Sequence, residues 1–151
     1  MFTAVEVDAE VLLGKLQRLA GERVASRRRE IVQAGSRIAL TETIERTPVD
    51  EGEARSSWVT GLTLLGGTPP AGWEGGHPKG ESIRAGSEAA SVEQIEGSVQ
   101  SEIQCRSDVE HVVYLEYGTR RMEPRASVQR SLAETAERIG EMEFLTAGML
   151  Q

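Results

Sequence analysis

The chain of 151 residues has little cysteine, histidine or aromatic content: one Cys, two His, and Phe, Trp and Tyr at 4% together. One cysteine cannot form an internal disulfide bond, and Cys105 with two histidines offers too few ligands for a structural zinc site. The composition therefore excludes a disulfide-stapled mini-protein and a zinc finger, and we expect no metal or other cofactor. So few aromatic rings also argue against a protein that stacks nucleic-acid bases.

Long hydrophobic runs are missing as well. No apolar stretch approaches the ~20 residues that a membrane-spanning helix needs. The first residues, MFTAVEVDAEV, carry acids instead of the basic start of a signal peptide. We therefore expect no membrane association, and synthesis in a reducing, cytosol-like compartment.

Basic residues are also in the minority. The chain has 17 basic and 24 acidic residues, which give a net charge of −7. Such a balance disfavours a protein that wraps a phosphate backbone. The charge is uneven: eight of the basic residues lie within 1–47, whereas 92–118 holds one basic and six acidic residues. The length fits a single domain over 1–151, here with faces of different charge.

Hydrophobic periodicity and turn residues predict an α+β fold. We expect a long helix over 8–46, a strand over 56–65, strands over 92–107 and a helix over 126–143. Residues 111–117 fit either a strand or a helical turn, and the Gly- and Pro-rich residues 66–91 predict a long extended loop. The two helices are expected to pack on an antiparallel sheet of about four strands.

Several positions carry more specific expectations. An apolar stripe in the first helix starts with Leu12, Leu16 and Leu19, and Gly14, Gly21 and Gly35 predict a bend or a close helix contact. The last helix is expected to bury a face made of Val128, Leu132, Ala136 and Ile139. Cys105 is expected to point inward as a small hydrophobic residue.

Sequence patterns of catalysis are absent. The chain has no Gly-x-Ser-x-Gly, no phosphate-binding Walker loop, no His-Glu-x-x-His and no Cys-x-x-Cys. Asp108, Glu110 and His111 fit an acid/base cluster or, more simply, a polar turn. We expect a protein that is not an enzyme.

Two motifs about 60 residues apart stand out. The first is Thr47-Pro48-Val49-Asp50-Glu51-Gly52, followed by Arg55-Ser56-Ser57-Trp58. The second is Tyr114-Leu115-Glu116-Tyr117-Gly118-Thr119-Arg120-Arg121-Met122-Glu123-Pro124, followed by the last helix. Each predicts a tight turn with charged side chains at its rim.

These two motifs, in this order, resemble the tail-completion, or head–tail joining (neck), family of tailed bacteriophages. The resemblance covers most of residues 25–140. It implies a structural virion protein, assembled in the host cytoplasm, that forms a homo-oligomeric ring, commonly a hexamer, at the neck. Its implied partners are the head-closure or connector protein and the tail tube protein, and DNA passes through the ring without specific binding.

Two alternatives remain open from the sequence. A tail-terminator ring, which caps polymerisation of the tail tube, has a similar architecture. A nucleic-acid-binding module would instead use Arg27, Arg28, Arg29, Arg120 and Arg121.

The neck hypothesis gives three sets of candidate residues. Candidates for contacts with other subunits or neck proteins are Arg27, Arg28, Arg29, Asp50, Arg55, Trp58, Trp73, Glu116, Arg120 and Arg121. Turn-forming candidates are Pro48, Gly52, Gly118 and Thr119. Acidic candidates for lining the DNA channel, where like charge would repel the duplex, are Glu93, Glu96, Glu102, Asp108 and Glu110.

Overall fold

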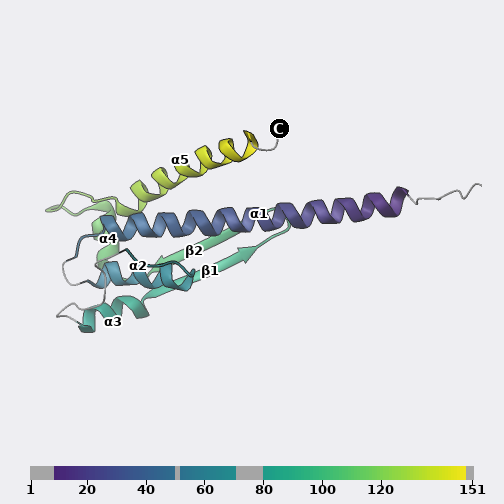
Figure 1. The fold of residues 1–151 in the computed structure, drawn as a ribbon. Coiled ribbons are helices and arrows are strands. Elements are labelled where there is room, and N and C mark those ends of the chain that lie inside the picture. Colours follow the sequence, from purple (N-terminus) through teal and green to yellow (C-terminus); the bar gives the residue numbers. More distant parts are fainter. Residues whose placement is uncertain (1–8, 50–51, 71–79, 149–151) are drawn as a thin grey trace, which may run out of the picture.

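The computed structural model describes residues 9–49, 52–70 and 80–148 (Figure 1). The fold in these ranges is α+β, as expected, with the element order α1 (Ala9–Arg46), α2 (Glu53–Leu64), α3 (Gly80–Glu88), β1 (Ala90–Glu96), β2 (Ser101–Ser107), α4 (Glu110–Tyr117) and α5 (Ser127–Gly148). The helix predicted over 8–46 and the helix predicted over 126–143 are both confirmed within one to five residues at their described ends.

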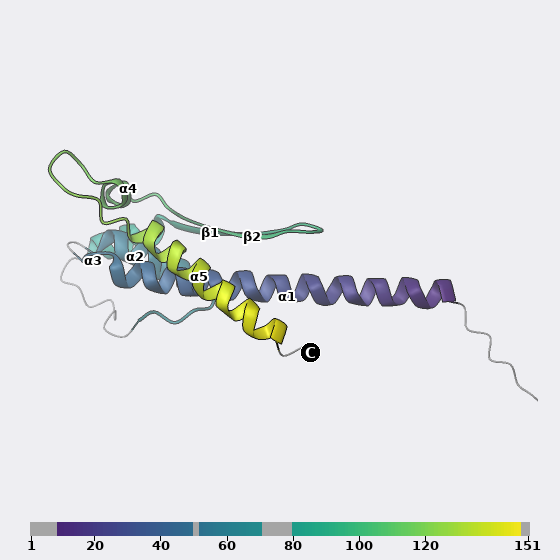
Figure 2. The same ribbon diagram turned by 90° about the horizontal axis from the view of Figure 1, so that it is seen from above.

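Helix α1 is the axis of the molecule. Its 38 residues span about 57 Å at 1.5 Å per residue. The other elements lie along its C-terminal half, and its N-terminal part extends beyond both the β1–β2 hairpin and α5 in two perpendicular views (Figures 1 and 2). The molecule is therefore elongated, with a body at one end and a projecting helix at the other.

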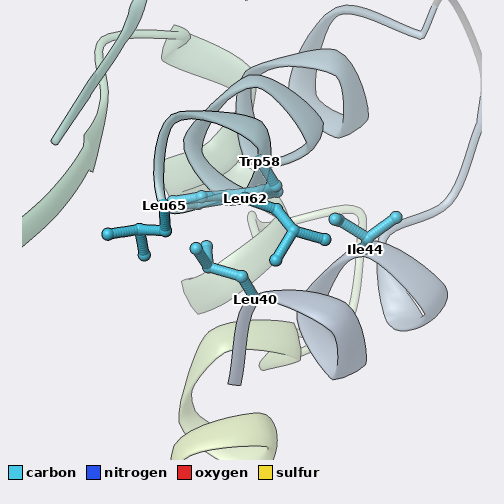
Figure 3. Close-up of a cluster of buried hydrophobic side chains, with 5 residues drawn as sticks. All are labelled: Leu40, Ile44, Trp58, Leu62 and Leu65. Carbon is cyan, nitrogen blue, oxygen red and sulfur yellow. The ribbon is translucent and has the colours of Figure 1, made fainter. Parts of the chain in front are cut away.

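The core is small and lies between α1 and α2 (Figure 3). Leu40 and Ile44 from α1 meet Trp58, Leu62 and Leu65 from α2 and its C-terminal cap. Trp58 is 8% exposed, so it belongs to this core and is not available to another subunit. Val92, Ile103 and Cys105 of the hairpin pack against the cluster, and the inward position expected for Cys105 is confirmed.

The strand predicted over 56–65 is wrong, because this segment is helix α2. Its buried residues Trp58, Leu62 and Leu65 are four and three positions apart, which is helical spacing. The alternation that suggested a strand fails at Leu64, which is 60% exposed. Ser57 and its neighbour Ser56 are buried, and each hydroxyl donates to a backbone carbonyl three residues earlier.

The sheet has two strands where about four were expected. β1 and β2 form an antiparallel hairpin in which Val92 lies opposite Cys105 and Glu96 lies opposite Ser101. The strand predicted over 56–65 is helix α2, and residues 111–117, which fitted either a strand or a helical turn, fall within helix α4. Gly97 lies in the hairpin turn, where its N–H donates to the backbone oxygen of Gln100.

The extended loop predicted over 66–91 is wrong in its second part, since α3 covers Gly80–Glu88 and β1 begins at Ala90. α3 packs on α2 at Gly86, where a Cβ atom would lie 2.0 Å from the backbone oxygen of Glu53. Only glycine permits this approach. Trp73 lies outside the described residues.

Helix α5 packs on α1 through small side chains. Ser127, Ser131 and Thr135 are buried, and the hydroxyls of the latter two donate to carbonyls one turn earlier. Gly35 makes the expected close contact, because a Cβ there would lie 2.6 Å from Cδ1 of Ile139. The apolar face predicted for this helix is wrong in part: Leu132 and Ala136 are exposed, whereas the buried positions are hydroxyl residues, which let the two helices approach closely.

Candidate functional site

The two motifs singled out in the sequence meet at one corner of the molecule. They enclose a hollow of about 340 Å³, which we call the corner hollow. Its lining comes from the end of α1, the start of α2, α4 and the loop after α4: Pro48, Gly52, Glu53, Ala54, His111, Tyr114, Leu115 and Met122. Segments about 60 residues apart thus form one structural unit.

The first motif turns the chain from α1 into α2. Thr47 is buried and donates its backbone N–H and its hydroxyl to the oxygen of Thr43, which closes the last turn of α1. Gly52 has φ of 84°, a left-handed conformation, and its oxygen accepts the N–H of Ser56. The turn role predicted for Gly52 agrees with this geometry, and Pro48 lies exposed just after α1. Asp50 lies outside the described residues, and Arg55 is partly buried on α2.

The second motif ends α4 and forms a tight turn. Gly118 has φ of 76° and ψ of −177°, and a Cβ there would lie 2.7 Å from the oxygen of Met122. Thr119 and Met122 pair with each other across the turn. Arg120 and Arg121 stand between them and are exposed, as expected of side chains at a turn rim.

Glu116 has a structural role that the sequence did not reveal. Its carboxylate is 8% exposed and accepts the N–H groups of Val128 and Gln129 at 2.9 and 2.8 Å. These N–H groups have no acceptor within the first turn of α5, so the side chain caps that helix. Its negative charge also interacts favourably with the positive end of the helix dipole. The proposed subunit contact through Glu116 is therefore replaced by a contact within the chain.

The rim of the corner hollow is polar. Nδ1 of His111 lies 3.9 Å from Oε2 of Glu53, and the hydroxyl of Tyr114 donates to Oε1 of Glu110 at 2.8 Å. The hydrogen bond to this carboxylate raises the pKa of Tyr114 above its ordinary value. His111 and Glu110 both contact Tyr114, one through the ring edge and one through the hydroxyl, and these contacts do not form the acid/base cluster with Asp108 considered from the sequence. Within the described ranges no group of three or more His, Cys, Asp or Glu residues could hold a metal ion.

The three consecutive arginines of α1 have separate environments. Arg28 donates to Oγ of Ser101 at 2.9 Å and to the oxygen of Gly97 at 3.0 Å, which fastens the hairpin turn to α1. Arg27 pairs with Glu30 on the surface, and Arg29 is exposed. Of the three, Arg28 is the one whose side chain binds the β1–β2 hairpin.

The acidic channel candidates lie along the hairpin and at the start of α4. Glu93 and Glu102 belong to the hairpin face that points away from the core, since they alternate with Val92 and Ile103. Glu96 accepts the hydroxyl of Ser101 at 2.8 Å near the hairpin turn. Asp108 and Glu110 are exposed beside the corner.

One surface was not recognised as such from the sequence. Leu13, Leu16, Leu19 and Val24 on the projecting part of α1 are 54–64% exposed, and we call them the leucine face. The apolar stripe was visible in the sequence, but periodicity indicates that a face exists and not whether the same chain covers it.

Comparisons with protein-family models, with curated proteins and with solved structures give no significant match. Among the described residues, no helix is both long and apolar enough to cross a bilayer.

Proposed function

We propose that this chain is a structural subunit of a tailed-bacteriophage neck, which completes the tail and joins it to the head as a homo-oligomeric ring. The observation that carries the proposal is the corner itself. The two motifs of the resemblance, distant in sequence, build one exposed unit with the Arg120–Arg121 turn at its edge. Such a unit suits contact with another protein better than catalysis, because Glu53 faces His111 and Glu110 binds Tyr114 around an open, largely apolar hollow.

Assembly is supported by the uncovered apolar surface. A monomer seldom leaves several large side chains of one helix face open to water, and such patches mark contact surfaces. The leucine face lies at the end of the molecule opposite the corner, so two different surfaces are free for head-to-tail contacts (Figures 1 and 2). Contacts of this kind generate closed rings when the rotation between copies closes.

The proposal places the acidic hairpin face toward the DNA channel. The face that points away from the core carries Glu93 and Glu102 with one basic residue, Arg106. Glu96 instead lies on the face that points toward the core, beside Ser101. Like charge would keep a passing duplex from adhering to the wall.

The nucleic-acid module is less favoured by the positions of the arginines. Arg28 is held by the hairpin and Arg27 by Glu30, while Arg120 and Arg121 lie in the loop after α4, at the far end of the body (Figure 1). Phosphate binding requires basic side chains gathered on one surface. A tail terminator would use the same subunit features, and we keep it as the second candidate.

The test is electron microscopy of the purified protein over a wide concentration range, combined with DNA-binding measurements at several salt concentrations. We expect rings and no salt-dependent affinity for duplex DNA. Labelling of the chain in the assembled particle then separates a neck ring from a tail terminator by its position relative to the head. A protein that stays monomeric and binds DNA more tightly at low salt would overturn the proposal.

A further inference from the structure

We propose that the corner hollow of one subunit receives the leucine face of α1 from the next subunit. The inference rests on the proposed function, because it names the contact that would build the ring. The occupant of the hollow is thus a second copy of this chain, bound as a helix in a groove.

The two surfaces match in chemistry. Leu13, Leu16 and Val24 lie three, eight and eleven residues apart, so they form one stripe with Leu19 at its border. The hollow offers apolar walls to such anchors, namely Pro48, Ala54, Leu115 and Met122, with the half-exposed ring of Tyr114 at its mouth. Its volume of about 340 Å³ gives room for leucine side chains, being at the lower end of the range for binding clefts, roughly 300–1,000 Å³.

The charges around the two surfaces are opposite. Residues 10–27 of α1 carry four basic and two acidic side chains, with Lys15 and Arg23 exposed next to the leucine face. On the side of α2 and α4 the rim of the hollow carries the carboxylates of Glu53 and Glu110, while Arg120 and Arg121 lie on the turn that precedes Met122. Opposite charges at the edge of an apolar contact orient the partners and exclude wrong ones.

Within one chain the two surfaces cannot meet. Leu16 lies 30 positions before Arg46, where α1 reaches the corner, and this separation is about 45 Å along a helix. The leucine face can therefore fill the hollow only in another copy. Because the two surfaces differ, every subunit offers one of each, and the contact runs head to tail.

The experiment is disulfide trapping in the full-length chain with Cys105→Ser as background. Leu16→Cys is combined with Met122→Cys in one variant and with Tyr114→Cys in a second, and each single-cysteine variant serves as control. After mild oxidation we expect a ladder of covalent multimers from the double variants and no cross-link from the single ones. In chains without the added cysteines, Leu16→Ala should lower the association constant about tenfold or more, because one buried leucine is lost from each contact.

The outcomes separate this contact from the ring itself. Multimers that form without a ladder of cross-linked species would overturn the inference and leave the ring proposal standing. A disulfide-linked dimer of the Leu16→Cys single variant would do the same, because it means that two α1 helices pair with each other. A protein that remains monomeric at every concentration would overturn both.

Discussion

At the level of single residues, two positions hold the corner in its shape. Gly118 adopts a backbone conformation that side chains rarely accept, and Glu116 places a buried carboxylate at the start of α5. Both lie in the second motif, and both act within the subunit. The motif is therefore first a folding element, and it presents Arg120 and Arg121 as a result.

Replacing Gly118 with alanine should destabilise the subunit. Its φ of 76° and ψ of −177° fall in a region used almost only by glycine, which costs about 1–3 kcal/mol for other residues. The new Cβ would also lie 2.8 Å from the nitrogen of Pro124. Urea unfolding measures the loss. Gly140→Ala is the matched control, because nothing lies within 4 Å of a Cβ there and α5 should gain up to roughly 1 kcal/mol. Equal effects of the two changes would contradict this account.

Replacing Glu116 with glutamine should lower the free energy of unfolding by roughly 1.5–3 kcal/mol, the range for hydrogen bonds to a charged group. The amide keeps one oxygen, but its NH₂ group faces an N–H donor of α5 that has lost its acceptor. Glu123→Gln, at an exposed carboxylate in the following loop, should change stability by less than about 0.5 kcal/mol. If unfolding curves of the two variants coincide, the capping role is wrong.

At the level of elements, α1 and α5 were predictable because their apolar spacing and the bounding prolines Pro48 and Pro124 are local features of the sequence. Helix α2 was not, since Trp58, Thr60, Leu62 and Leu64 alternate as in a strand. Burial of Trp58, Leu62 and Leu65 against α1 selects the helix, and no local signal contains that contact. The same limit hid the cap formed by Glu116, whose partners begin twelve residues later, whereas the turn glycines Gly52 and Gly118 could be recognised from their neighbours.

The β1–β2 hairpin should depend on Arg28 for the order of its turn. A two-stranded hairpin is marginal by itself, and Arg28 joins this one to α1 at Ser101 and Gly97. Arg28→Met should speed amide hydrogen exchange at Gly97–Ser101 and leave the core end of β2 near Cys105 unchanged. Arg29→Met removes an exposed neighbour and should change neither region. Equal exchange rates at Gly97–Ser101 in the Arg28→Met and Arg29→Met variants would show that the hairpin turn is ordered without Arg28.

The contact of α1 with α5 should weaken in acid. Arg46 donates a hydrogen bond to Glu134 and lowers the pKa of that carboxyl below its ordinary value of 4.5, with Arg138 adding to the effect. The charged form is thus favoured in the folded state. This stabilisation is present above pH 4.5 and is lost as the pH falls through the lowered pKa.

Urea midpoints of the wild type and of Glu134→Gln should therefore differ at neutral pH and converge as the pH falls below 4.5. The difference should shrink in high salt, because the pair is solvent-accessible. Glu137→Gln, on the exposed side of the same helix, provides the comparison. A gap between wild type and Glu134→Gln that stays constant down to low pH would refute the assignment.

At the level of the whole molecule, folding and assembly should be separable. The core that holds the subunit together lies at one end, whereas the leucine face lies on the projecting part of α1, in contact with water. Leu16→Gln should accordingly change the free energy of unfolding of the monomer by less than about 0.5 kcal/mol and yet suppress multimers. Leu62→Ala, at a fully buried position, should cost about 2–5 kcal/mol in the same unfolding experiment.

Light scattering and urea unfolding on the same samples measure both properties. We expect Leu16→Gln to affect assembly more than unfolding. An exposed leucine adds little to folding stability, but its burial stabilises the contact when a second subunit covers it. A Leu16→Gln protein that unfolds as easily as Leu62→Ala would mean that the projecting helix is stabilised within its own chain. The apolar side chains of α1 would then belong to the fold, and the elongated shape of the subunit would no longer point to a neighbour.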